Sequence, residues 1–395
     1  YEPDRLYALG SRLAVSLNRG DDWEFISPNI TRQIDRDTLP VMGRVWPENA
    51  VWKNVFTNEY GIGVAFSESP LESNTLYVGT DDGLIQVTED GGVTWRKIDA
   101  FPGIPELIYV SAVLASRHDP DRVYALFNNH KRGDFTPYVL RSDDRGRSWE
   151  TIAGDLPARH VVWDIIEDRV NPDLLFLGTE FGLFFTLEGG RQWVELTEGS
   201  PTIPYRDLEI HEGMGDLVAA TFGRGFMILD DYTPLRTIAT AAASDRATLF
   251  DPRRTRVFNP IRYFSAGSGA GEYTAPNPPF GAILNYYLPA GSASESGDLI
   301  LVVRGPDGEL VAEVEGVKEA GLHRAIWNLR EMPEEEEESA ESRGRRRTGP
   351  LVSAGEYPVT LELRGEDGTR TLAGPVILRV IPFGRTRYVR ISDGR

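Results

Sequence analysis

One eight-residue phrase occurs twice in this chain and constrains the fold more than any other feature. It is TEDGGVTW at residues 88–95 and SDDRGRSW at 142–149, so both copies follow Ser/Thr-x-Asp-x-Gly-x-Ser/Thr-Trp. Two weaker copies, SLNRGDDW at 16–23 and TLEGGRQW at 186–193, carry Asn and Glu in place of the Asp. A catalytic motif is normally needed once, whereas a structural phrase recurs when the fold itself repeats. The phrase therefore predicts a repeat protein.

The sequence around each copy repeats as well. A β-rich segment, a Gly-rich hairpin and a second β-rich segment precede the phrase, and another strand follows it, as in NTLYVGTDDGLIQVTEDGGVTWRKI. A fifth unit at 215–231 has the first two strands without the Trp phrase, and a further strand precedes most units. Four antiparallel strands per unit are typical of propeller blades. We therefore predict an all-β chain with about five propeller blades at residues 1–236.

Each position of the phrase has a structural use. The Asp carboxylate accepts hydrogen bonds from the backbone of its own turn, the Gly supplies a positive φ, and the Trp packs between neighbouring blades. We expect Asn and Glu to imitate the Asp in the weaker copies. A structural role is therefore assigned to the following phrase residues: Asn18, Trp23, Asp90, Gly92, Trp95, Asp144, Gly146, Trp149, Glu188, Gly190 and Trp193.

These phrases resemble the Asp-box, or BNR repeat, of sialidase-type, sortilin-type (VPS10-like) and xyloglucanase-type propellers. Stretches such as SPLESNTLYVGTDDGLIQVTEDGGVTW and ATFGRGFMILDDYTPLR are most similar to a bacterial family of sortilin-like BNR-repeat proteins, often labelled glycosyl hydrolase. The resemblance implies an exported bacterial protein that is periplasmic, cell-surface or secreted. The family commonly has His before its last Gly-Arg-Gly, where this chain has Phe222.

Composition excludes several kinds of partner and chemistry. The net charge of −18 disfavours nucleic acid and anionic membranes, and no apolar run approaches the roughly 20 residues of a membrane helix. Without cysteine there is no disulfide, thiolate nucleophile or Cys-ligated zinc. We expect no metal and no cofactor. No signal peptide is visible, and because the first unit begins inside a blade, we expect an upstream portion of the propeller in a parent chain.

The second half of the chain predicts a different β domain. Residues 237–279 are rich in small and turn-forming residues and are predicted to be a linker. Strand-like segments and Asp-Gly hairpins over 280–383 favour an immunoglobulin-like sandwich, and they resemble the Ig-like module of the flagellar hook-capping family. The acidic and then basic run within 331–350 is predicted to be a mobile charged loop, and 384–395 a C-terminal tail.

Candidate site residues lie on the blade face opposite the phrase turns. The hairpin between the second and third strands of each blade opens on that face, which normally holds a propeller's ligand site. The ligand-binding candidates are Asp81, Asp82, His130, Asp134, Glu180 and Arg224, of which Asp82, Asp134 and Glu180 are also the catalytic candidates. A tight-turn role is the alternative for the carboxylates, because Asp-Asp-Gly is a good turn sequence. We interpret Trp46 and Trp52, in the connection 27–60, as filling space between blade edges rather than stacking on sugars.

Two functions remain open at this point. The first is an exported, non-catalytic scaffold that binds a protein, peptide or glycan. The alternative is a glycoside hydrolase, which needs two carboxylates about 5–5.5 Å apart for retention or about 6.5–9.5 Å apart for inversion. A sialidase is disfavoured because only Arg224 is plausibly placed to bind a substrate carboxylate, and no Gly-x-Ser-x-Gly or His-Glu-x-x-His motif indicates a peptidase. A fold alone does not decide, because propellers host unrelated functions.

Overall fold

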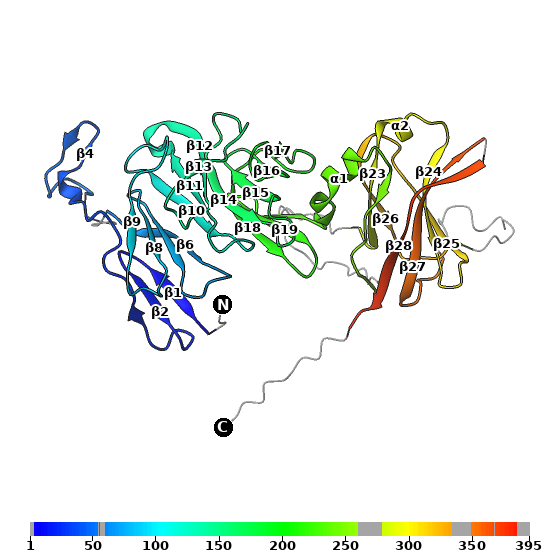
Figure 1. Cartoon of the computed structure of the whole chain (residues 1–395), viewed down its shortest axis with the longest axis horizontal. Coiled ribbons are helices and arrows are strands. Elements are labelled where there is room, and N and C mark those ends of the chain that lie inside the picture. The colour runs from blue at the N-terminus through cyan, green and yellow to red at the C-terminus, as the bar shows by residue number, and fades with distance from the viewer. Residues whose placement is uncertain are drawn as a thin grey trace, which may run out of the picture. The chain divides into compact units, whose positions relative to one another are not determined.

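The computed structural model describes residues 4–53, 55, 60–259, 279–333, 349–366 and 368–384 (Figure 1). The chain divides after Tyr232 into two compact units. Both units are built from β-sheets, so the all-β prediction is confirmed. None of the helices in the described part of the chain is long and apolar enough to cross a membrane.

Unit one contains five successive antiparallel sheets that have the strand order of propeller blades. The first and fifth sheets have three strands and the other three have four, each in simple sequence order. The strands are β1 (Leu6–Leu9), β2 (Leu13–Ser16) and β3 (Glu24–Phe25); β6 (Gly63–Glu68), β7 (Leu76–Thr80), β8 (Ile85–Thr88) and β9 (Arg96–Ile98); β10 (Tyr109–Ala115), β11 (Val123–Asn129), β12 (Asp134–Ser142) and β13 (Glu150–Thr151); β14 (Val162–Glu167), β15 (Leu175–Thr179), β16 (Leu183–Thr186) and β17 (Val194–Glu195); and β18 (Tyr205–His211), β19 (Asp216–Thr221) and β20 (Phe226–Leu229).

The two full copies of the phrase form identical turns between the third and fourth strands. Asp90 accepts hydrogen bonds from the Thr94 hydroxyl (2.6 Å) and the Thr94 backbone N–H (2.8 Å), and these bonds lower its pKa to about 2. Asp144 is held in the same way by Ser148; slight burial opposes the effect, but the hydrogen bonds lower its pKa to about 2 as well. Carboxylates that bind their own turn so strongly are poor proton donors near neutral pH.

The weaker copies separate into one that follows the pattern and one that does not. Asn18 accepts from the Asp22 backbone N–H at 2.9 Å, so the amide oxygen replaces the carboxylate. In the fourth copy, the Asp155 side chain from the preceding blade accepts the Trp193 backbone N–H at 2.7 Å. Within the described residues, no hydrogen bond joins the Glu188 side chain to its turn. The expectation that Glu188 imitates the Asp is therefore wrong, because its side chain does not accept the turn hydrogen bonds that Asp90 and Asp144 accept.

Apolar residues of neighbouring sheets share common cores. One cluster joins the second and third sheets and another joins the third and fourth, while the Trp193 indole N–H donates to the Ile152 carbonyl of the preceding blade at 2.9 Å. Gly79 marks a close approach, because a Cβ at this position would lie 2.4 Å from a methyl group of the fully buried Val110. Blade stacking therefore requires both large apolar side chains and a glycine in the same strand.

A connection between the first and second sheets leaves the blade pattern. It contains the 3-10 helix η1 (Arg36–Thr38) and a two-stranded hairpin of β4 (Pro40–Val41) and β5 (Arg44–Val45). The hairpin extends from the blades in Figure 1. We call residues 31–53 the insertion segment.

Unit two contains two sheets that enclose one apolar core. The three-stranded sheet consists of β21 (Thr248–Leu249), β23 (Ala282–Leu288) and β26 (Gly321–Trp327). The five-stranded sheet consists of β22 (Thr255–Val257), β28 (Gly368–Pro382), β27 (Gly355–Gly365), β24 (Asp298–Arg304) and β25 (Leu310–Glu315). Side chains of both sheets belong to one buried cluster, which makes unit two a β-sandwich. The immunoglobulin-like topology stays a prediction.

The segment predicted to be a linker contains strands of this sandwich. Strand β21 pairs with β23, and β22 pairs in parallel with β28. Short strands among small and turn-forming residues lack the alternation by which longer strands are detected, which is why the sequence indicated a linker. The unit also has η3 (Thr233–Arg236), α1 (Ile238–Ala243) and α2 (Ala290–Ala293). The predicted charged loop lies outside the described residues at 334–348, as does the predicted tail at 385–395.

Candidate functional site

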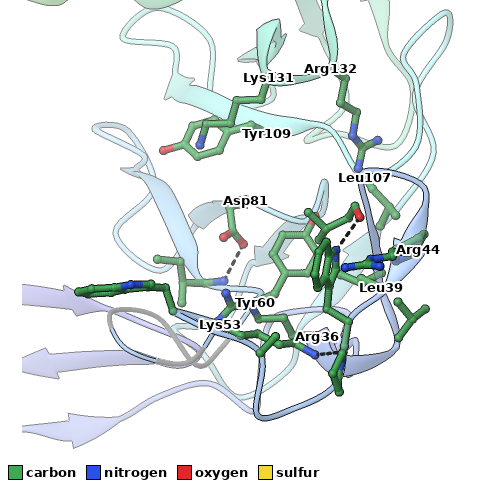
Figure 2. Close-up of a pocket in the computed structure, with 18 of the residues that line it drawn as sticks. Arg36, Leu39, Arg44, Lys53, Tyr60, Asp81, Leu107, Tyr109, Lys131 and Arg132 are labelled. Carbon is green, nitrogen blue, oxygen red and sulfur yellow. Dashed lines mark hydrogen bonds between the residues drawn. The ribbon is translucent and has the colours of Figure 1, made fainter.

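Unit one contains a cavity of about 1410 Å³ on the hairpin face, opposite the phrase turns. The insertion segment forms one side of it (Figure 2). The β7–β8 hairpin and the turn after β11, which contains η2 (His130–Arg132), form the other sides. The volume exceeds what most drug-sized ligand sites require. The second and third blades and the connection that precedes them therefore build one site.

Four aromatic side chains line this cavity. Trp46 and Trp52 come from the insertion segment, Tyr60 precedes β6, and Tyr109 begins β10. Trp52 is 67% exposed, so the interpretation of this residue as a filler between blade edges is wrong. The sequence analysis misjudged it because the segment projects from the blades instead of packing between them. Flat rings at the wall of an open cavity are suited to stack on a ligand face.

Asp82 holds the base of the insertion segment. Its side chain is fully buried and accepts hydrogen bonds from the Arg32 backbone N–H (2.7 Å) and from the Thr80 hydroxyl (2.5 Å). The Arg32 guanidinium also donates to the Asp82 carbonyl oxygen at 2.9 Å. With both carboxylate oxygens engaged and no solvent exposure, Asp82 has a positioning role for the cavity wall, and the structure gives it no access to a substrate.

Asp81, its neighbour, faces the cavity. The carboxylate accepts the Ile62 backbone N–H at 2.7 Å (Figure 2). Burial raises the pKa of Asp81, and the nearby Asp82 charge raises it further. Among the described residues that line the cavity, Asp81 is the one carboxylate. A half-buried acid with a raised pKa in a cavity is a candidate proton donor.

Five basic side chains also line the cavity. These are Arg36, Arg44, Lys53, Lys131 and Arg132. Lys53 forms an ion pair with Asp37 at 2.6 Å and donates to the Trp46 carbonyl oxygen at 2.6 Å. The Arg44 guanidinium lies over the Trp46 ring, 3.3 Å from its centre. Basic residues interleaved with tryptophans in the 27–60 connection were the available sequence signal.

Asp134 and His130 lie in the turn that closes β11 and β12, but neither is a lining residue. Asp134 accepts hydrogen bonds from Asn129 (3.1 Å) and Tyr138 (2.8 Å); burial opposes the effect, yet these bonds lower its pKa. The Nδ1 atom of His130 lies 2.8 Å from the Asn128 side-chain oxygen, and burial lowers the pKa of the imidazole. Asp134 is therefore committed to its own loop.

Glu180 belongs to a separate cluster farther along the same face. Its carboxylate accepts the Trp163 indole N–H at 2.9 Å and lies 3.5 Å from an Arg206 nitrogen. The Arg206 guanidinium in turn lies 3.4 Å from the centre of the Trp163 ring. The structure does not bring Glu180 into the cavity with Asp81, and Arg224 is exposed outside the lining residues. Four of the six ligand-binding candidates are thus absent from the cavity wall, and Asp82 supports it from behind.

One position of the blade repeat occurs both at the cavity and at the Glu180 cluster. In three blades the residue after the Thr that ends the second strand donates its backbone N–H to the connection that precedes the first strand. Asp81 donates to Ile62 at 3.0 Å, Glu180 to Val161 at 2.9 Å and Phe222 to Pro204 at 2.9 Å. The same backbone position therefore carries the cavity carboxylate of Asp81, the paired carboxylate of Glu180 and the side chain of Phe222, which is 70% exposed.

Comparisons with known proteins identify partial relatives. No family model matches the sequence. The chain is 28% identical to the oligoxyloglucan-reducing end-specific xyloglucanase of Emericella nidulans over 167 residues, which are 41% of this chain and 17% of that enzyme. It is 24% identical to xyloglucanase Xgh74A of Acetivibrio thermocellus over 220 residues, 50% of this chain and 25% of that enzyme. The chain thus matches a quarter or less of the length of each relative.

Solved structures give weaker likenesses. The GH74 xyloglucanase of Xanthomonas campestris has a TM-score of 0.40 at 15% identity, covering 58% of this chain and 35% of that one. YCF48 of Cyanidioschyzon merolae has a TM-score of 0.32 at 22% identity, covering 42% of this chain and 52% of that one. Likenesses at this level carry no argument about function. The sequence relatives are xyloglucanases, and the sheets of unit one have the blade order of a β-propeller.

Proposed function

We propose that unit one belongs to a glycan-active propeller, that its cavity binds an oligosaccharide, and that Asp81 is the candidate proton donor. The observation that carries the proposal is the cavity itself, in which aromatic rings surround one carboxylate whose pKa burial raises. Aromatic faces stack on sugar rings, and an acid of raised pKa is what glycosidic bond cleavage requires. Two xyloglucanase relatives support a glycan over a protein ligand.

A non-catalytic glycan-binding module is the second candidate. Hydrolysis requires a second carboxylate across the scissile bond. Among the described lining residues no partner stands beside Asp81, and Asp82 is buried in the wall. This observation favours recognition without cleavage by the part of the chain that the structure describes. In either case the resemblance to exported BNR-repeat proteins supports an extracytoplasmic location.

The test is a screen of the full chain against plant and bacterial oligosaccharides, scoring binding and reducing-end release in the same samples. Release that is lost in Asp81→Asn, with binding retained, supports the hydrolase. Binding that weakens in Trp52→Ala without any release supports the recognition module. Binding unaffected by Trp52→Ala refutes the assignment of the cavity, and the absence of both signals refutes a glycan function. Asp90→Asn is the matched control, since this carboxylate lies in a phrase turn on the opposite face.

A further inference from the structure

We propose that the cavity selects an acidic saccharide, one whose sugar rings carry carboxylate or sulfate groups. The inference rests on the proposed function, because it specifies the class of glycan that the same cavity binds. It does not follow from the relatives, whose names specify xyloglucan.

The charge of the cavity is opposite to that of the whole chain. Five basic side chains and one carboxylate line it, whereas the chain has 42 Lys and Arg against 60 Asp and Glu. A cleft lined mainly by one sign of charge focuses the field and attracts ligands of the opposite sign. The chain is acidic on average, but the excess of basic groups at this aromatic cavity gives the cavity a local preference for anions.

The basic groups reach the cavity from two sides. Arg36, Arg44 and Lys53 come from the insertion segment, and Lys131 and Arg132 come from the β11–β12 turn (Figure 2). Lys131 lies over the Tyr109 ring, with its amino group 5.7 Å from the ring centre. A ligand between the two sides meets cations and ring faces together, which is the arrangement that an anionic sugar matches.

These cations differ in how far the protein already uses them. Lys53 is paired with Asp37, and Arg44 is stacked on Trp46, so both stabilise the wall. Lys131 and Arg132 are exposed, and Arg132 gives one donor to the Glu106 carbonyl oxygen at 3.2 Å. A guanidinium has five N–H donors in a planar fork that fits a carboxylate or sulfate in bidentate geometry. The β11–β12 turn therefore supplies the cations for the ligand.

Arg36 adds a further cation to the wall of the cavity. Its Nη1 atom is buried, and no described residue accepts a hydrogen bond from it. A buried cationic donor without an acceptor is costly, and native structures rarely keep one without a reason. An anionic ligand in the cavity would compensate the charge of the Arg36 guanidinium, which a neutral sugar cannot do.

The experiment measures binding of three oligosaccharides of matched length to the full chain by titration calorimetry. They are a neutral xyloglucan fragment, an oligogalacturonate and a sulfated neutral fragment. We expect at least one acidic oligosaccharide to bind at least about tenfold more tightly than the neutral one, the value of one charge-assisted hydrogen bond. Raising the ionic strength from about 0.1 M to about 1 M, which shortens the Debye length from about 10 Å to about 3 Å, should remove most of this preference.

The variant Lys131→Gln/Arg132→Gln tests the assigned cations. It should weaken the acidic ligand at least about tenfold and the neutral one less than about twofold, since only charge is removed. Lys97→Gln is the matched control, because Lys97 is an exposed lysine of β9 outside the lining residues. Thermal melts of all variants confirm that each is folded.

The outcomes separate the two proposals. Neutral and acidic ligands bound equally, or an equal loss for both in the double variant, overturns the acidic preference and leaves the glycan function standing. No binding of any of the three overturns both. A preference for the oligogalacturonate identifies a carboxylate as the anion, and a preference for the sulfated fragment identifies a sulfate.

Discussion

Asp81 and Asp82 are adjacent in the sequence, yet the structure predicts very different effects for their removal. Asp82 is fully buried and fixes the start of the insertion segment, whereas Asp81 is half-buried and faces the cavity. Replacing each by alanine removes one carboxylate from the same hairpin. Both variants lose one carboxylate, so comparing them distinguishes the positioning role of Asp82 from the ligand contact of Asp81.

The expected loss for Asp82→Ala follows from its hydrogen bonds. Two donors lose their acceptor, the Arg32 backbone N–H and the Thr80 hydroxyl. A hydrogen bond to a charged group contributes about 1.5–3 kcal/mol, and Thr80 retains the Leu84 carbonyl oxygen as a second acceptor at 3.3 Å. We therefore expect unfolding of unit one to require about 3–4 kcal/mol less. In a unit of this size that lowers Tm by on the order of 10 °C.

Asp81→Ala should be much milder for stability. It removes the acceptor of the Ile62 N–H, which lies near solvent, at a cost of about 1 kcal/mol. The assay is a thermal melt of both variants by calorimetry, followed by saccharide binding at a temperature where both are folded. A Tm for Asp82→Ala within about 2 °C of that for Asp81→Ala, where the calculated difference is several times larger, would refute the tether assigned to Asp82.

Three further predictions concern protonation and packing. Protonation of Asp81 removes the negative charge in the cavity, so an acidic saccharide should bind more tightly as pH falls through the raised pKa of Asp81, and binding titrations of Asp81→Asn should lack that trend. Burial raises the pKa of Asp164 to about 7. Between about pH 4 and pH 7 the folded state holds this proton and the unfolded state has lost it, so the free energy of unfolding should fall as the pH rises through this range. Denaturant titrations should show a fall of about 2 kcal/mol, discounted for partial solvent exposure, and Asp164→Asn should abolish it. Gly79→Ala should destabilise unit one by about 2 kcal/mol in the same titrations, because its Cβ would meet Val110 at 2.4 Å, and a neutral result would contradict the close blade contact.

Repetition made the blades predictable from the sequence. Each unit repeats its strand pattern, so the same prediction rests on several independent segments. Strands β6, β10, β14 and β18 lie where the sequence predicted the further strand that precedes most units. The same method failed at β21 and β22, which have two and three residues. Such strands are specified by the partners they pair with in the sandwich, and those partners lie far along the chain.

The candidate site was less predictable because it depends on what lies outside the repeat. The sequence indicated the hairpin face and Asp81 on it, but it does not show that Asp82 turns into the wall. Arg36, Arg44 and Arg132 were missed because their importance arises from convergence of the insertion segment with a turn in the third blade. Spacing along the chain carries no information about such a convergence.

The repeat position shared by Asp81, Glu180 and Phe222 limits what chemistry this face can perform. The Glu180 carboxylate is engaged by the Trp163 indole N–H and by the Arg206 cation, and Phe222 has no proton to give. Asp81 alone has both a raised pKa and an open cavity in front of it. If this cavity releases reducing ends, Asp81 is the described lining residue that can act as the acid, and the second carboxylate has to come from outside that lining. A variant that retained full release without the Asp81 carboxylate would place the chemistry elsewhere and reduce the cavity to a binding site.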